Sequence, residues 1–225
     1  MSDCEQILKR LRSMSNPRNV EGMARFGINP KDTLGVSMPE LRRLGKQIGK
    51  DHALALRLWG SGIHEARILA ALVDEPAKVT EAQAEKWVRQ FDSWDVCDQV
   101  CMNLFDRTPF AHAKAIEWAS RTREFERRAG FSLMAVLAVH DKESGDGAFL
   151  KFLPAIKRAS VDERNFVKKA VNWALRQIGK RNLSLNKAAI KAAEEIQKMD
   201  SKSARWIAKD ALRELRSGAV RKRLK

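Results

Sequence analysis

The spacing of apolar residues is the feature of this chain that most restricts its fold. These residues recur three and four positions apart almost from end to end, and no stretch alternates apolar and polar residues as a half-buried strand would. Some helix starts are marked locally, because Asn16 precedes Pro17 and Ser37 is followed by an acidic first turn at Glu40. The sequence therefore predicts an all-α protein, with further helix starts near Thr80, Ser93, Pro109, Gly147, Asp162, Ser184 and Ser201.

Similar helical segments recur along the chain. Five of them share an apolar rhythm flanked by charges, at intervals of about 30 to 40 residues: His64–Leu69, Trp94–Gln99, Phe125–Gly130, Phe166–Val171 and Ala204–Lys209. Such intervals are typical of two-helix repeats of the HEAT or armadillo kind, in which each pair buries its apolar face against its neighbours. We expect a single HEAT-like repeat domain over residues 1–220, wound as a right-handed α-α superhelix (a solenoid), followed by a basic tail over residues 221–225.

The positive charge of the chain is concentrated in its last third. The formal net charge is +15, and residues 151–225 carry 21 basic and 7 acidic side chains, whereas residues 76–150 carry 10 and 12. A basic surface confined to one region is typical of proteins that bind phosphates. We therefore expect the concave face of the solenoid to bind double-stranded DNA. Structured RNA stays an alternative, because a basic groove does not by itself distinguish the two.

The cysteines and histidines do not indicate a metal site. Cys4, Cys97 and Cys101 cannot all pair within one chain and have no histidine at ligand spacing, so we interpret them as buried, reduced thiols. We expect neither a metal ion nor a cofactor. The sequence shows no apolar run of membrane-spanning length and no signal-peptide pattern. We accordingly expect a monomer in the bacterial cytoplasm that acts at the nucleoid and has no membrane partner.

One predicted helix start combines a carboxylate with an aromatic ring. With Ser93 as the N-cap, Trp94 and Asp98 stand one turn apart on the same helix face. Arg128 follows about one repeat later and Trp173 about two repeats later, so a curved array could bring the four side chains to one inner wall. From spacing alone, core packing is the commoner explanation of such a pair. We interpret the other tryptophans as packing residues: Trp59, Trp87, Trp118 and Trp206. We interpret the four histidines as ordinary surface or core residues: His52, His64, His112 and His140.

The chain resembles the DNA alkylation repair family of AlkD-like alkylpurine DNA glycosylases. The resemblance spans most of the chain and is carried by Met23–Phe26, Leu34–Glu40, Ser93–Asp98, Arg127–Ala129 and Phe166–Arg176. It implies a HEAT-like fold that excises positively charged N3- or N7-alkylpurines from duplex DNA and leaves an abasic site, without a lyase step and without inserting the base into a pocket. It also implies that Asp98, Trp94, Trp173 and Arg128 are the catalytic residues. Phe26 departs from the tyrosine of some members, and Ser37 from their glutamine.

These residue types suit that reaction. An alkylated purine already carries a positive charge and leaves without a general acid, while positive charge develops on the sugar. The carboxylate of Asp98 would stabilise that charge, the two tryptophans would offer it their π faces, and Arg128 would hold a phosphate. Basic candidates for phosphate contacts lie in the last third: Lys168, Lys169, Arg176, Lys180, Arg181, Lys209, Arg213 and Arg216. The alternative is a non-catalytic helical-repeat protein that binds nucleic acid or a protein partner.

Overall fold

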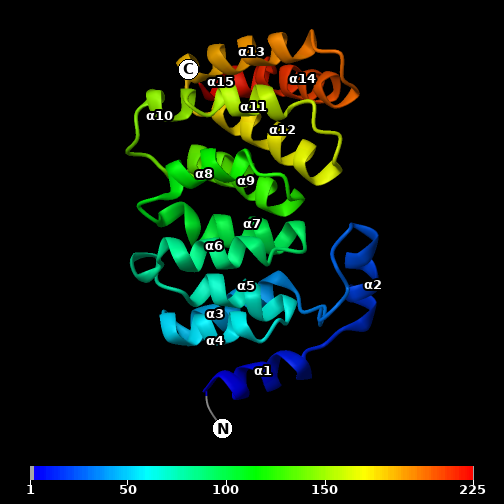
Figure 1. Cartoon of the computed structure of the whole chain (residues 1–225), viewed down its shortest axis with the longest axis vertical. Helices are drawn as coiled ribbons and strands as arrows, with labels where there is room; N and C mark the ends of the chain where they lie inside the picture. The colour runs from blue at the N-terminus through cyan, green and yellow to red at the C-terminus, as the bar shows by residue number, and fades with distance from the viewer. Residues whose placement is uncertain (1–2, 225) are drawn as a thin grey trace. The chain divides into compact units, whose positions relative to one another are not determined.

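The computed structural model describes residues 3–224, in which all regular structure is helical. This confirms the all-α prediction (Figure 1). The chain divides into two compact units, Met1–Thr108 (unit 1) and Pro109–Lys225 (unit 2). The domain predicted over residues 1–220 thus contains two compact units. Within residues 3–224, no helix is both long enough and apolar enough to cross a membrane.

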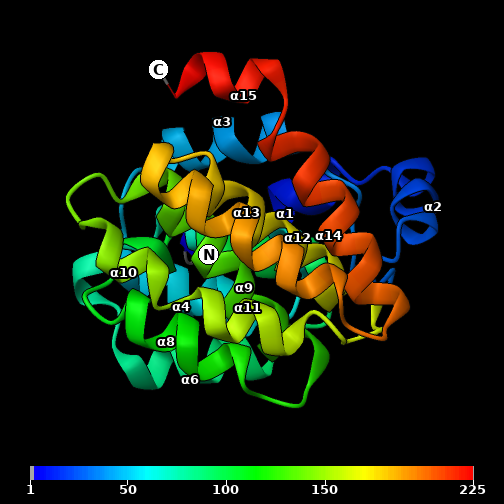
Figure 2. The same cartoon turned by 90° about the horizontal axis from the view of Figure 1, so that it is seen from above.

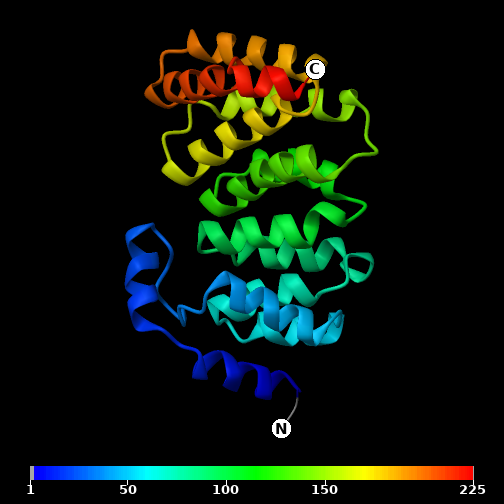
Figure 3. The same cartoon turned by 180° about the vertical axis from the view of Figure 1, so that it is seen from behind.

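Unit 1 is built around one buried helix. Helix α5 packs against α3, α4 and α7, and most of its residues are buried. Helix α2 is different, because it has no buried residue and runs across the ends of the other helices (Figure 3). The elements of unit 1 are α1 (Asp3–Ser13), α2 (Pro17–Arg25), α3 (Met38–Ile48), α4 (His52–Gly60), α5 (His64–Val73), η1 (Pro76–Lys78), α6 (Glu81–Arg89), α7 (Trp94–Asn103) and η2 (Phe105–Arg107).

Unit 2 has two central helices, α9 and α12, which pack against each other. Helix α8 packs on α9, and α13 and α14 pack on α12 and on each other, side by side in Figure 2. Gly130 of α9 makes the α8–α9 contact possible, since a Cβ there would lie 2.3 Å from the backbone nitrogen of Ala119. The elements are α8 (Ala111–Ala119), α9 (Glu124–His140), α10 (Asp146–Leu150), α11 (Leu153–Ala159), α12 (Asn165–Gly179), α13 (Leu183–Gln197), α14 (Lys202–Leu215) and α15 (Gly218–Arg223).

Helix starts with a strong local signal lie where they were predicted. Asn16 caps α2 by accepting a hydrogen bond from Asn19 N, and Ser37 forms a capping box with Glu40 at the start of α3. The start predicted at Asp162 is three residues early, because its carboxylate is held by Arg164, the residue that precedes α12. The predicted basic tail is helical as far as Arg223, within α15, and its last residue lies outside the described part of the chain.

Candidate active site

Helix α7 carries the tryptophan and the aspartate that the sequence singled out. It begins at Trp94, after Ser93, whose hydroxyl accepts a hydrogen bond from Asn29 N at 2.8 Å. Trp94 and Asp98 are four residues apart and therefore share one face of the helix. Fully buried apolar residues anchor α7 in the core of unit 1: Val96, Cys97, Val100 and Cys101, followed by Leu104.

The ring of Trp94 is held in place by a hydrogen bond to α2. Its indole Nε1 donates to the carbonyl oxygen of Phe26, at 3.1 Å. Phe26 follows the last residue of α2 and exposes 75% of its own surface. The C-terminal end of α2 is therefore attached to the first residue of α7, and a phenylalanine ring projects beside it.

Asp98 lies in a buried and electronegative part of α7. Only 9% of its surface is exposed. Burial raises the pKa of the neighbouring Cys101 thiol well above its usual value, and the hydrogen bond and charge of Cys97 and the carboxylates of Asp98 and Asp106 raise it further. The cysteines of α7 are free and buried, as the sequence predicted for all three cysteines. A negative potential at low dielectric is a setting in which a cation is stabilised more strongly than in water.

The other two predicted catalytic residues belong to unit 2. Arg128 is buried on α9, and its guanidinium donates to the carbonyl oxygen of Phe166 at 2.5 Å. Phe166 lies in the first turn of α12, the helix that also carries the half-buried Trp173. The structure thus brings Trp94 and Asp98 together on one helix of unit 1, and it fastens Arg128 to the helix of Trp173 in unit 2.

The predicted phosphate contacts fall into two groups. Most form ion pairs within unit 2: Arg176 with Asp210 and Glu214, Lys180 with Glu214, Arg216 with Glu194 and, within α14 itself, Arg213 with Asp210. Arg181 donates to the carbonyls of Ala138 and Ser144 and lies 4.1 Å from the ring of Phe149. Lys169 and Lys209, in contrast, are exposed cations.

Trp206 was predicted to be a packing residue, and this prediction is wrong. It exposes 43% of its surface, and the ammonium group of Lys168 lies 5.4 Å from its ring. Trp59, Trp87 and Trp118 are buried, as predicted. Periodicity could not distinguish Trp206 from the three buried tryptophans, because a tryptophan at the edge of an apolar helix face has the same spacing as a buried one.

Sequence reasoning missed a His–Asp pair next to the predicted site. His64, the first residue of α5, is buried, and its Nε2 lies 2.8 Å from Oδ2 of Asp95 in the first turn of α7. Burial alone would lower the pKa of His64, but the hydrogen bond and charge of Asp95, with the charges of Glu65 and Asp92, raise it above its usual value. A signal was present, because His64 begins one repeat segment and Asp95 is the second residue of the next.

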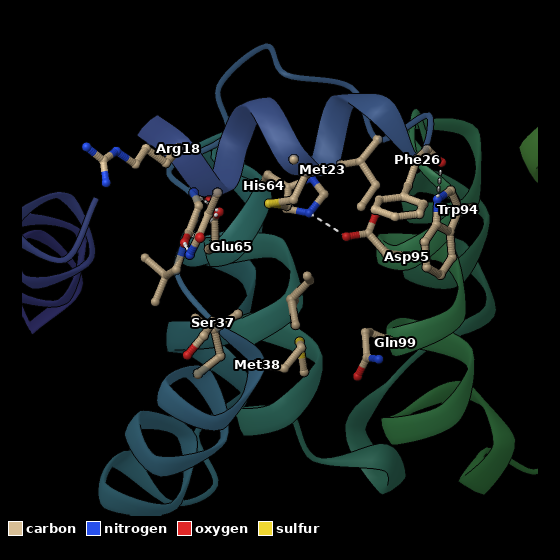
Figure 4. A pocket seen from close by; sticks show the side chains of 17 residues that line it. Arg18, Met23, Phe26, Ser37, Met38, His64, Glu65, Trp94, Asp95 and Gln99 are labelled. Carbon is tan, nitrogen blue, oxygen red and sulfur yellow. Dashed lines mark hydrogen bonds and ion pairs between the residues drawn. The ribbon is translucent and has the colours of Figure 1, made fainter. Parts of the chain in front are cut away.

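A cavity of about 610 Å³ opens beside this pair, wholly within unit 1 (Figure 4). Helix α2 covers one side through Met23 and Phe26, and α3, α5 and α7 form the rest. One wall is the loop before α3, which the buried Glu65 carboxylate holds by accepting hydrogen bonds from three successive backbone nitrogens at 2.9, 2.6 and 3.3 Å, those of Leu34, Gly35 and Val36. Gly35 suits this loop, since its φ is +78° and a Cβ would lie 2.3 Å from Asn16 O.

Comparison with a solved structure identifies the fold as that of HEAT-like repeat proteins. The chain is similar to a structure described as a new family of proteins related to the HEAT-like repeat DNA glycosylases, with affinity for branched DNA structures. The TM-score is 0.78 at 20% sequence identity, over 94% of this chain and 95% of the other. The predicted solenoid of helix pairs is thereby confirmed as the fold class.

The sequence comparison then gives the family. Residues 7–215 match the family described as DNA alkylation repair enzyme. The chain therefore belongs to the DNA alkylation repair family. It is also similar to the uncharacterized protein Lin0241 of Listeria innocua, with 22% identity over 199 residues that cover 87% of each chain.

Proposed function

We propose that this protein is a monofunctional DNA glycosylase that removes N3- or N7-alkylated purines from duplex DNA and leaves an abasic site. The observation that carries the proposal is the buried carboxylate of Asp98, one helical turn from Trp94 on α7, in a chain of the DNA alkylation repair family. A fixed negative charge is the group that this reaction needs, because positive charge develops on the deoxyribose as the glycosidic bond breaks.

The magnitude of the electrostatic effect is sufficient for a measurable role. At a separation of about 4 Å and an effective dielectric constant near 20, one charge stabilises an opposite charge by about 4 kcal/mol. That free energy corresponds to roughly a thousandfold in rate. The cationic base is already a good leaving group, so Asp98 acts on the sugar and aligns the attacking water, and no acid is required.

The remaining residues serve binding and orientation. Trp94, fixed by its hydrogen bond to Phe26, presents a π face to the cation, and Trp173 and Arg128 keep the roles that the resemblance implies, on the sugar and on a phosphate. The concentration of basic residues in the last third supports duplex DNA as the partner. Exposed cations such as Lys169 and Lys209 contact phosphates, together with those ion-paired arginines that exchange a carboxylate for a phosphate.

The test is the release of 7-methylguanine from methylated duplex DNA. Asp98→Asn keeps the size of the side chain and removes its charge, so we expect a loss of release of about a thousandfold with DNA binding retained. Asp92→Asn is the matched control, since Asp92 is an exposed aspartate six residues away in the loop before α7. Release by Asp98→Asn at the rate of the wild type would refute the role of Asp98.

A second candidate is a DNA-binding protein without glycosylase activity. It is favoured by the structural likeness over 94% of the chain to a protein described by its affinity for branched DNA structures. Binding to duplex and branched DNA should be measured beside base release with the wild-type protein. Tight binding of a junction with no release of any alkylated base would favour this candidate over the glycosylase.

A further inference from the structure

The exposed tryptophan of unit 2 stands where two helices of that unit meet. Helices α12 and α14 pack against each other (Figure 2). Trp206 of α14 leaves 43% of its surface in solvent, and the ammonium group of Lys168 on α12 lies 5.4 Å from the centre of its ring. The lysine thus contacts the ring without burying it. Tryptophan is enriched at surfaces that bind a partner, so this ring is a candidate contact.

The surface beside this ring is positively charged. Lys202 and Lys209 lie one helical turn before and after Trp206 on the same face of α14, and both are exposed. Lys168 adds a third cation. A tryptophan that dominates a protein–protein contact usually stands in a well-packed pocket that excludes water. A tryptophan among cations is instead typical of proteins that bind single-stranded nucleic acid, in which the cations follow the backbone and the bases stack on aromatic rings.

The carboxylates closest to the ring along these helices are bound by groups of the protein itself. Asp210, one turn after Trp206, forms ion pairs with two arginines of unit 2. Hydrogen bonds from the start of α14 lower the pKa of Glu163, and the charges of Lys168 and Lys202 lower it further. A phosphate that approaches the ring therefore meets lysines, and the acidic groups nearby already have partners.

We propose that Trp206 is a stacking site for an unpaired base of the bound DNA. Lys202 and Lys209 are seven residues, about 10 Å, apart along the helix axis, so their flexible side chains can reach the phosphates on both sides of one nucleotide. A base inside a duplex is stacked on its neighbours and is not available to a ring on the protein surface. The site therefore requires a single-stranded nucleotide, such as one at a strand end or in a gap. The inference rests on the proposed function for DNA as the partner, but it does not involve base release.

Three DNA molecules separate stacking from electrostatic attraction. The first is a blunt duplex, the second carries a short single-stranded extension of adenine nucleotides, and the third carries the same extension with every base removed and every phosphate kept. Binding to the full-length protein is measured by fluorescence anisotropy. We expect the wild type to bind the second about tenfold more tightly than the third, since stacking on one aromatic ring contributes about that factor. Equal affinities for these two DNAs would overturn the inference.

Variants of the ring locate the site. Trp206→Ala removes the ring at an exposed position and should lose the preference for the extension that carries bases, whereas Trp206→Phe should keep part of it. Leu183→Ala is the matched control, because Leu183 on α13 of the same unit exposes 51% of its surface, and this variant should keep the full preference. Circular dichroism verifies that each variant is folded. Full preference in Trp206→Ala would overturn the inference, and so would full preference in Trp206→Phe if Trp206→Ala does not fold.

The lysines provide an independent measurement. Lys202→Gln and Lys209→Gln each remove one phosphate contact and leave the ring in place. Each should therefore weaken the binding of both extended DNAs by the same factor and keep the tenfold preference between them. Loss of the preference in these variants would mean that the lysines, and not the ring, distinguish the base, and would overturn the inference.

Base release by the same wild-type protein separates this inference from the proposed function. If the protein releases 7-methylguanine but shows no preference for the extension that carries bases, the inference alone fails. If the preference is present but no base is released, the glycosylase proposal alone fails. Failure to bind any of the three DNAs would overturn both. Tighter binding of an RNA extension than of the DNA extension would overturn DNA as the ligand of this site.

Discussion

Glu65 is the residue whose replacement most directly tests how the wall of the cavity is built. Its buried carboxylate accepts hydrogen bonds from the backbone nitrogens of Leu34 and Gly35, at 2.9 and 2.6 Å, and a longer one from Val36. Glu65→Gln preserves the shape of the side chain but leaves one acceptor oxygen where there were two. The side-chain NH2 group that replaces the second oxygen is itself a donor, and it faces a backbone N–H that also needs an acceptor.

The loss of stability follows from these three hydrogen bonds. One backbone N–H loses its acceptor, at about 1–3 kcal/mol for a buried group. The two remaining hydrogen bonds now have a neutral acceptor in place of a charged one. Each is therefore weakened by about 1 kcal/mol, the difference between charged and neutral hydrogen bonds. The expected decrease in the free energy of unfolding is therefore about 3–5 kcal/mol. For a chain of this length, it lowers Tm by roughly 6–20 °C.

Thermal unfolding followed by circular dichroism measures this change. Glu21→Gln is the control, because Glu21 is an exposed glutamate on α2 of the same unit, and it should leave Tm unchanged. A Tm of Glu65→Gln within about 2 °C of the wild type would refute the view that this carboxylate holds the loop.

Three further predictions concern packing, pH and salt. Gly130→Ala would place a Cβ 2.3 Å from Ala119 N, so it should force α8 and α9 apart and destabilise the protein by about 1–3 kcal/mol in urea unfolding. The pKa of His64 is raised in the folded protein, so its pair contributes fully below pH 6.5 and is lost as the pH rises through the folded pKa. The stability advantage of the wild type over His64→Asn should accordingly shrink as the pH rises above 6.5, and a constant advantage would contradict this. If about six phosphates are neutralised, a plot of the logarithm of the DNA association constant against the logarithm of the salt concentration should have a slope near −5. Lys169→Ala and Lys209→Ala should each reduce the magnitude of this slope by about 1.

The sequence by itself determined the features that depend on neighbours along the chain. Helix periodicity and capping residues act within four positions, so the all-α fold and the starts at Asn16 and Ser37 could be predicted. The shared face of Trp94 and Asp98 follows from the same geometry, because residues four apart meet on a helix. The charge of the last third is a property of composition and needs no fold.

Only the tertiary structure decided which distant groups meet. His64 and Asp95 are 31 positions apart, and Glu65 reaches a loop 29 to 31 positions before it. Local patterns do not encode such contacts, because they depend on how each helix pair rotates and packs against the next. The same packing turned Trp206 toward solvent and left an apolar cavity beneath α2. Periodicity shows that a helix face is buried, but packing decides whether side chains or an open space lie against it.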